Sequence, residues 1–385
     1  MIGMLSLKIM PAYAYNADLL LINAFLWLLM FYICKPFKVL MHPALGAKQT
    51  RSLYNCCFII MYIYSVFAFA DHDTYHTWRE FALHSKLGGH YEPFYKWLSV
   101  FLDGNYFLWR ACVWGVAVGS LYFVGRWLNL CNRGFLIIMI LFLPHSYFCA
   151  TRGAAGHALA LLGFILFIGD KPVHKRHFIL GILAIAASFF MHKSNFLFIT
   201  FLLIGWLLPL RFSKSAVWTL LLAYPLFTFV ITFLLNSFIQ GDFKLEFGED
   251  MNIQGYSMEY VELGRKQYSV LTKIIDFYRL LPYLLSCAYL TYKISFKKIK
   301  IDKIYFFLYK FSFIAVYVAM LFYFQPASDW LYRRIFFMSI FPMIFVFGKL
   351  VGMEATRSKL VKFIFWNQLI YVLFFSFSYW YYKWR

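Results

Sequence analysis

The chain has 385 residues, of which 62% are hydrophobic, 23% aromatic and only 14% charged. A soluble domain of this length needs more polar surface than such a composition supplies, so soluble classes are excluded. The formal net charge of +20 would suit a nucleic-acid partner, but the placement of the basic residues gives another explanation. We expect an all-α polytopic integral membrane protein that forms a single membrane domain over residues 1–385.

Apolar runs long enough to cross a bilayer recur along the chain. A span needs about 20 apolar residues, and the hydropathy pattern predicts about 12 transmembrane helices. Two longer connections interrupt the pattern, at 71–104 and at 239–276. The predicted spans cover residues 18–34, 53–70, 105–124, 134–150, 153–169, 178–191, 195–210, 216–238, 277–292, 304–324, 331–348 and 363–380.

The basic residues alternate between the two sides of these spans. If the N-terminus lies outside the cytoplasm, the short connections on the cytoplasmic side carry most of the lysines and arginines and few acids. This is the positive-inside pattern, and it accounts for nearly all of the net charge. No nucleic-acid partner is therefore expected. The same orientation places both longer connections, and the expected chemistry, at the outer face.

Several predicted helices that run inward from the outer face begin with a basic residue, although the helix dipole disfavours a cation there. A helix N-terminus and guanidinium donors together suit a phosphate group. The alternative is that these side chains bind lipid headgroups nonspecifically, and Arg333 could instead pair with Asp329 four residues earlier. The residues are Arg110, Arg152, Lys193, Arg279, Arg333 and Arg334.

Arg152 is the strongest candidate of this group. It is followed by a run of small residues, GAAGHA at 153–158. Small residues let neighbouring helices approach closely and leave the backbone accessible. We therefore expect Arg152 to bind a phosphate, and the small residues to give clearance either for a bulky ligand or for a close helix neighbour.

The first longer connection combines acids, histidines and aromatic side chains. Asp71, Asp73 and Glu92 could accept hydrogen bonds from sugar hydroxyls, and a carboxylate beside an acceptor hydroxyl could act as general base. Tyr75 offers a face for a sugar ring, with an interfacial aromatic belt as the alternative. Asp71, Asp73 and His76 could also hold a metal ion, but their spacing is weak evidence and we assign no metal site.

Several stretches resemble motifs of the EpsG-type branch of the O-antigen and exopolysaccharide polymerases, the Wzy-like proteins. DHDTY at 71–75 is similar to an aspartate–tyrosine motif of that family, and EPFYKWL at 92–98 to its glutamate–glycine–phenylalanine segment. TRGAAGHALALL at 151–162 resembles its arginine-led helix of small residues, and FMHKSNFLF at 190–198 its phenylalanine–histidine–x–serine motif. The chain departs from the pattern at Pro93, Lys193 and Asn195.

The resemblance implies an enzyme, a glycosyltransferase that joins oligosaccharide units carried on undecaprenyl diphosphate into O-antigen or exopolysaccharide. It implies the outer face of the bacterial cytoplasmic membrane as the place of reaction, which is the periplasmic face in a Gram-negative cell. Donor and acceptor are both lipid-linked, no cofactor is implied, and a partner that regulates chain length is a further expectation. A weaker analogy leads to GT-C-type membrane glycosyltransferases.

For this chain, the resemblance implies that Arg152 binds the donor diphosphate. The leaving group is a lipid diphosphate anion, and arginines can stabilise the charge that develops on it. His192 and Asp73 are expected beside the reacting hydroxyl, with the identity of the general base left open. The expected substrate-binding residues are Asp71, Tyr75, Glu92, Lys193, Arg279, Arg333 and Arg334.

Two other functions remain open at this point. One is a GT-C-type glycosyltransferase that adds a single sugar from a polyprenyl monophosphate, with Asp71 and Asp73 holding a metal ion. The other is a flippase or exporter of lipid-linked sugars. A transporter would line a path through both leaflets with polar groups, whereas the unusual charges here cluster at one predicted face.

Overall fold

The computed structural model describes residues 47–67, 77, 80–81, 83–84, 87, 91–130, 151–168, 175–192, 195–207, 213–240, 270–323, 329–353, 363 and 366–367. Within these ranges every regular element is helical, with ten α-helices, one π-helical turn and no strand. The prediction of an all-α protein is therefore confirmed for the described part of the chain.

The helices follow the apolar runs of the sequence. Nine of the twelve predicted spans each coincide with a described helix. These nine are the spans from 53–70 to 331–348 other than 134–150. The predicted spans 18–34 and 134–150, and nearly all of 363–380, lie outside the described residues. In chain order the elements are α4 (Ala47–Phe67), α6 (Pro93–Phe101), α7 (Tyr106–Trp127), α9 (Thr151–Ile168), α10 (Lys175–Met191), α11 (Asn195–Leu207), α12 (Lys214–Gln240), α14 (Val270–Thr291), the π-helical η3 (Tyr292–Phe296), α15 (Lys303–Tyr323) and α16 (Asp329–Met353).

Three of the described helices are long and apolar enough to cross a membrane: Tyr106–Trp127, Lys214–Leu234 and Lys303–Tyr323. The second of these, in α12, presents a stripe of large apolar side chains to its surroundings. Leu222 is 77% exposed and Phe229 is 70% exposed. A stripe of this kind would be costly in water and is matched by lipid. The chain is thus a helical membrane protein, whereas the count of 12 spans and the orientation stay predictions.

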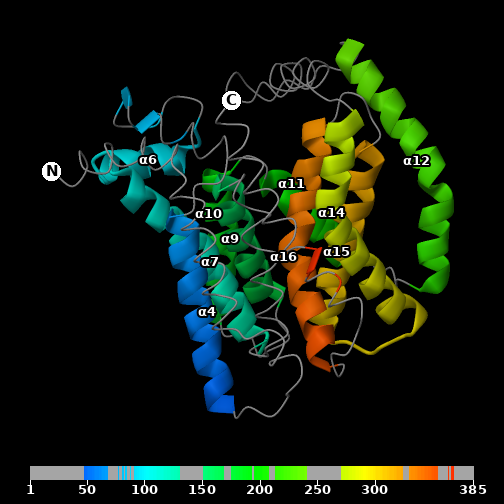
Figure 1. Cartoon of the computed structure of the whole chain (residues 1–385), viewed down its shortest axis with the longest axis horizontal. Coiled ribbons are helices and arrows are strands. Elements are labelled where there is room, and N and C mark those ends of the chain that lie inside the picture. Colours follow the sequence, from blue (N-terminus) through cyan, green and yellow to red (C-terminus); the bar gives the residue numbers. More distant parts are fainter. Residues whose placement is uncertain are drawn as a thin grey trace. The chain divides into compact units, whose positions relative to one another are not determined.

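The chain divides into two compact units, residues 1–202 with 344–385 and residues 203–343. In the first unit, α4 packs on α7, α7 on α9, and α9 on α10, so that the four helices form a row (Figure 1). The short helix α6 lies across this row and contacts α7 and α10. The loop predicted at 71–104 therefore contains a docked helix.

Two glycines let α9 and α10 approach closely. A Cβ atom added to Gly163 would lie 2.7 Å from the carbonyl oxygen of Gly181, and one added to Gly181 would lie 2.7 Å from the carbonyl oxygen of Gly163. Backbone atoms cannot give way as the end of a side chain can. Gly163 of α9 therefore allows a close crossing with α10, as small residues commonly do between helices in membranes.

A buried arginine joins α4 to α7. Arg110 is only 2% exposed. Its Nε donates to the carbonyl oxygen of Ser65 in α4 at 3.0 Å, and its Nη1 donates to the hydroxyl of Tyr106 at 3.0 Å. Arg110, which the sequence grouped with candidate phosphate ligands at helix starts, is thus a buried contact between helices.

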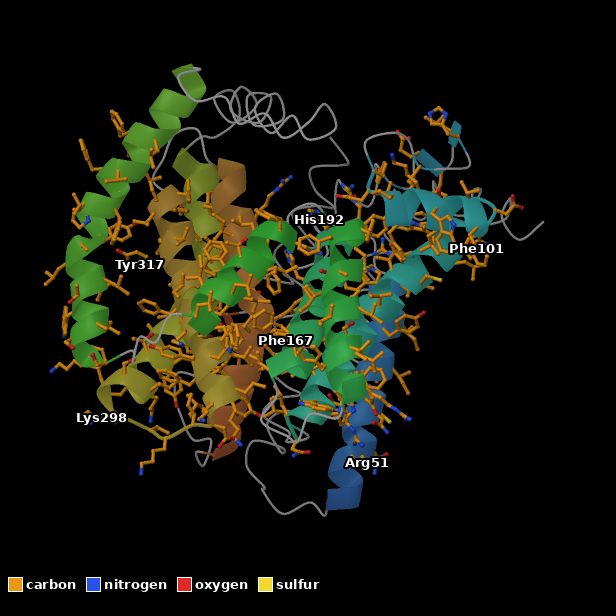
Figure 2. The ribbon with its side chains drawn as sticks, turned by 180° about the vertical axis from the view of Figure 1, so that it is seen from behind. Arg51, Phe101, Phe167, His192, Lys298 and Tyr317 are labelled. Atoms are coloured by element: carbon orange, nitrogen blue, oxygen red, sulfur yellow. The ribbon has the colours of Figure 1, made fainter. Side chains whose placement is uncertain are left out.

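In the second unit, α12 is held to α15 by a reciprocal pair of tyrosines. The hydroxyl of Tyr224 donates to the carbonyl oxygen of Met320 at 2.8 Å, and the hydroxyl of Tyr317 donates to that of Leu220 at 2.6 Å. The two rings meet edge to face with centroids 5.6 Å apart, an arrangement that adds to the burial energy. Figure 2 shows Tyr317 between the ribbons of these two helices.

We predict that Gly181→Ala destabilises the protein, because the new methyl group must push α9 away from α10. Overpacking of this kind costs about 1–3 kcal/mol. Gly119→Ala on α7 is the matched control, since a Cβ there meets no atom within 4 Å. The measurement is the apparent melting temperature of both variants in the same detergent. Equal melting temperatures would contradict the tight crossing.

Candidate functional site

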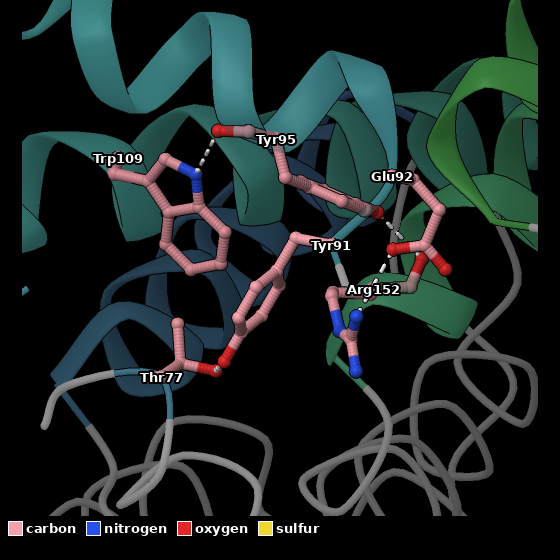
Figure 3. Close-up of polar contacts among 6 residues, drawn as sticks. All are labelled: Thr77, Tyr91, Glu92, Tyr95, Trp109 and Arg152. Atoms are coloured by element: carbon pink, nitrogen blue, oxygen red, sulfur yellow. Dashed lines mark hydrogen bonds and ion pairs between the residues drawn. The ribbon is translucent and has the colours of Figure 1, made fainter. Parts of the chain in front are cut away.

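Arg152 lies in the first turn of α9, the helix that begins at Thr151. Its Nη1 donates to Oε2 of Glu92 at 3.0 Å, and its Cζ lies 4.6 Å from the ring centroid of Tyr91. The side chain of Arg152 is 25% exposed and that of Glu92 is 7% exposed. Figure 3 shows this ion pair and the aromatic residues around it. The arginine is partly buried, yet it keeps an accessible surface that a ligand could reach.

Pro93 accounts for the conformation of Glu92. Proline is favoured at the first position of a helix because its φ angle is already helical, and α6 begins at Pro93. The residue before a proline is driven to extended backbone, and Glu92 has φ −65° and ψ 153°. The proline that departs from the family pattern thus helps to aim the carboxylate.

Tyr95, in the first turn of α6, ties that helix to the start of α9. Its hydroxyl donates to the carbonyl oxygen of Arg152 at 2.8 Å, while its own carbonyl oxygen accepts from Nε1 of Trp109 at 3.3 Å. Burial raises the pKa of the Tyr95 phenol well above its usual value; the charge of Glu92 raises it further, and that of Arg152 lowers it. The phenol stays protonated and keeps its hydrogen bond to Arg152.

Asn195, the first residue of α11, packs against Gly156 in the second turn of α9. It is fully buried, and its Nδ2 donates to the carbonyl oxygen of Ser188 near the end of α10. A Cβ atom on Gly156 would overlap the Asn195 amide. Of the two expectations for the small residues, the close helix neighbour is what the structure supports at Gly156.

Two histidines lie close together at this end of α9. His157 is 4% exposed and stacks on Phe198, with ring centroids 4.7 Å apart. The ring centroid of His192, at the end of α10, lies 6.3 Å from that of His157. Figure 2 labels His192 at this end of α10. The sequence singled out His192 and assigned no role to His157.

The predicted site residues divide into three groups. Arg152, Glu92 and His192 belong to the first unit and lie around the start of α9, although Glu92 pairs with Arg152 where the sequence expected it to bind sugar hydroxyls. Arg279 lies on α14, and Arg333 and Arg334 lie on α16, within the second unit. The residues that lie outside the described ranges are Asp71, Asp73, Tyr75 and Lys193.

Tyr95 and Asn195 are residues of this cluster that the sequence did not assign. Tyr95 could have been found from its spacing, because it lies three residues after Glu92 in a helix that Pro93 predicts. Asn195 carried only the signal of a polar residue at the start of an apolar run. Its burial depends on Gly156 in another helix, which no local pattern reveals.

Comparisons with protein-family models, curated proteins and solved structures find no match to this chain. The class of the protein therefore follows from its fold and composition alone. It is a helical membrane protein with a partly buried arginine–glutamate pair at the start of a helix. Within the described ranges, no group of three or more His, Cys, Asp or Glu side chains could hold a metal ion.

We predict that Glu92 and Arg152 stabilise the fold as a pair. Glu92→Gln and Arg152→Met should each lower the apparent melting temperature, because each leaves a partly buried charge unpaired. The double variant should lose less than the sum of the two single losses, with a coupling of about 1–2 kcal/mol given the partial exposure of Arg152. Arg176→Met, at an exposed arginine in the first turn of α10, is the control and should not couple to Glu92→Gln. Additive losses would show that the pair contributes no coupling.

Proposed function

We propose that this protein is a Wzy-type polymerase, which joins oligosaccharide repeat units carried on undecaprenyl diphosphate into O-antigen or exopolysaccharide. One observation carries the proposal. Three stretches that resemble motifs of that family, around Glu92, Arg152 and His192, meet at the first turns of α9. A shared binding site requires residues this far apart in sequence to come together.

The proposed donor site is the first turn of α9. Backbone N–H groups at a helix N-terminus and the guanidinium of Arg152 can donate to the same phosphate oxygens. Without a ligand, Glu92 holds the guanidinium in place. A diphosphate carries more charge and more acceptor oxygens than one carboxylate, so it can share the guanidinium or take it from Glu92.

In the proposed reaction, an oxygen of the acceptor unit forms a bond to the anomeric carbon of the growing chain. The bond between that carbon and the donor diphosphate breaks, and the diphosphate leaves as an anion. Arg152 stabilises this developing charge, and electrostatic stabilisation of this kind often contributes more to catalysis than any other effect. The acceptor's hydroxyl proton passes to a base, for which His192 and Asp73 are the candidates.

The remaining predicted site residues keep the roles expected from the sequence. Asp71, Tyr75 and Lys193 would contact the sugars or phosphates, and the substrate-binding roles of Arg279, Arg333 and Arg334, which belong to the second unit, stay predictions. The chain would cross the bacterial cytoplasmic membrane about 12 times, with this site at the outer face. It would require no cofactor and would work beside a partner that regulates chain length.

We predict that Arg152→Ala stops polymer growth. The variant should reach the membrane, but only single repeat units should decorate the lipid acceptor, because the leaving diphosphate loses its cation. A loss of about 2–4 kcal/mol of transition-state stabilisation corresponds to about 10²–10³-fold in rate. Gel analysis of the polysaccharide in a deletion strain carrying the variant measures chain length. Arg176→Ala is the matched control and should restore the normal length distribution.

Arg152→Lys separates charge from geometry in the same assay. It keeps the positive charge but loses the planar fork that grips two oxygens, so chains should be shorter than normal yet longer than single units. Polymer of normal length from Arg152→Ala, with the variant present at normal abundance in the membrane, would overturn the proposal.

A deletion strain distinguishes the proposed polymerase from the two other functions. Loss of a polymerase should leave single lipid-linked units at the outer face, where an added glycosidase can reach them. Loss of a flippase would leave them at the cytoplasmic face, protected from that enzyme. A GT-C-type transferase would instead leave each unit one sugar short, and its activity in membranes would fall on addition of a metal chelator.

A further inference from the structure

The helix α6 has two faces of opposite character. Tyr95, Leu98 and Ser99 are buried against the rest of the first unit. On the other side, Trp97 is 63% exposed and Phe101 is 70% exposed. The Trp97 and Phe101 rings stack on each other, with centroids 5.4 Å apart and planes 16° apart. The exposed rings therefore form a continuous apolar surface over one side of α6.

Val100 extends this surface, which we call the α6 apolar face: Trp97, Val100 and Phe101. Val100 is 65% exposed. Positions three and four apart lie on the same side of a helix, so the three side chains point in one direction. Figure 2 shows Phe101 on the outer side of α6, away from the neighbouring helices. An exposed face this apolar suits a helix that lies in a membrane interface.

The short connection between α6 and α7 indicates what covers the α6 apolar face. Only the turn Leu102–Asn105 separates α6 from α7, one of the helices long enough to cross a membrane. The turn is sharp, because Asp103 has φ 50° and Gly104 has φ 68°. Asn105 then caps α7, accepting from the backbone N–H of Leu108 at 3.1 Å. A helix joined so directly to the end of a span lies at the membrane boundary.

Exposed apolar side chains occur on α7 as well. Leu108, in the first turn of α7, is 51% exposed, and Phe123 near its other end is 61% exposed. If α7 crosses the membrane, these side chains face lipid, and the α6 apolar face precedes the first of them closely in sequence. Tryptophan is enriched at membrane interfaces, where an apolar ring with a polar N–H is favoured.

We infer that α6 is an interfacial helix, whose α6 apolar face rests in the lipid headgroup layer and so holds the Arg152–Glu92 pair at the depth of lipid phosphates. The opposite face connects α6 to the Arg152–Glu92 pair. Tyr95 donates to the backbone carbonyl of Arg152, and Glu92 directly precedes the helix. The inference holds whether or not the protein is a polymerase. It implies a ligand whose phosphate is presented at headgroup depth, as that of a lipid-linked compound is.

The test measures the depth of α6 in the full-length protein. p-Acetylphenylalanine is placed at Trp97, Val100 or Phe101 and coupled to a hydroxylamine nitroxide, which leaves the seven native cysteines unchanged. The protein is reconstituted in vesicles of phosphatidylcholine and phosphatidylglycerol. Power-saturation EPR then compares collisions of each label with oxygen, which enters lipid, and with a nickel chelate, which stays in water.

We expect labels at all three positions to collide more with oxygen than with nickel, at a shallow depth. A label at Phe229, on the exposed stripe of α12, should be deeper. A label at Asp103, exposed in the turn, should favour nickel. Nickel accessibility at Trp97 and Phe101 equal to that at Asp103 would overturn the inference, because the face would then meet water. Low accessibility to both reagents would also overturn it, because protein would then cover the face.

The outcome is independent of the polymerase proposal. If labels show α6 in the headgroup layer while Arg152→Ala makes normal polymer, the proposed function fails and the interfacial helix stands. If polymer growth depends on Arg152 but the labels meet water, the interfacial helix fails and the proposed function stands.

Discussion

A cation in the first turn of an apolar helix is the constraint around which the first unit is organised. The helix dipole disfavours Arg152 at that position by a few tenths to about 1 kcal/mol, and its partial burial adds to the cost. Glu92 offsets both effects, since a carboxylate near a helix N-terminus is favoured by the dipole as well as by the arginine. The pair spans 60 residues of sequence, so its formation requires α6 to lie where it does.

The close packing of α9 follows from its small residues. Ala154, Ala155 and Ala158 are fully buried, and Gly163 crosses Gly181 of α10 at backbone distance. Because lipid tails solvate apolar side chains as well as protein does, helices in membranes associate mainly through such close fits. A rigid α9 in turn gives Arg152 a fixed position, which an electrostatic role requires.

Several polar side chains of the first unit gather around the start of α9. Arg152 and Glu92 lie on one side of the α9 start, while His157 and His192 lie about one turn further along. Asn195 fills the space that Gly156 leaves. If α6 rests in the headgroup layer, the partly exposed Arg152 lies at the depth of lipid phosphates, which is the depth at which a lipid-linked substrate carries its charge.

Helix positions were largely readable from the sequence. The predicted spans 105–124 and 304–324 correspond to Tyr106–Trp127 and Lys303–Tyr323, because an apolar run of span length has few alternatives to a helix in lipid. Arg152 at a helix start was predicted on the same ground. Arg110 was misjudged, since its burial against α4 depends on which side of α7 faces that neighbour.

The sequence by itself determined that this is a helical membrane protein, where most of its described helices lie, and that Arg152 opens one of them. These features follow from local composition, because backbone polar groups in lipid must be satisfied within the helix itself. Only the tertiary structure decided that Glu92 is the partner of Arg152, that Asn195 packs on Gly156 and that the two histidines are neighbours. Those contacts join separate helices, and the rotation of one helix against another is set by packing between them, which no single stretch of sequence encodes.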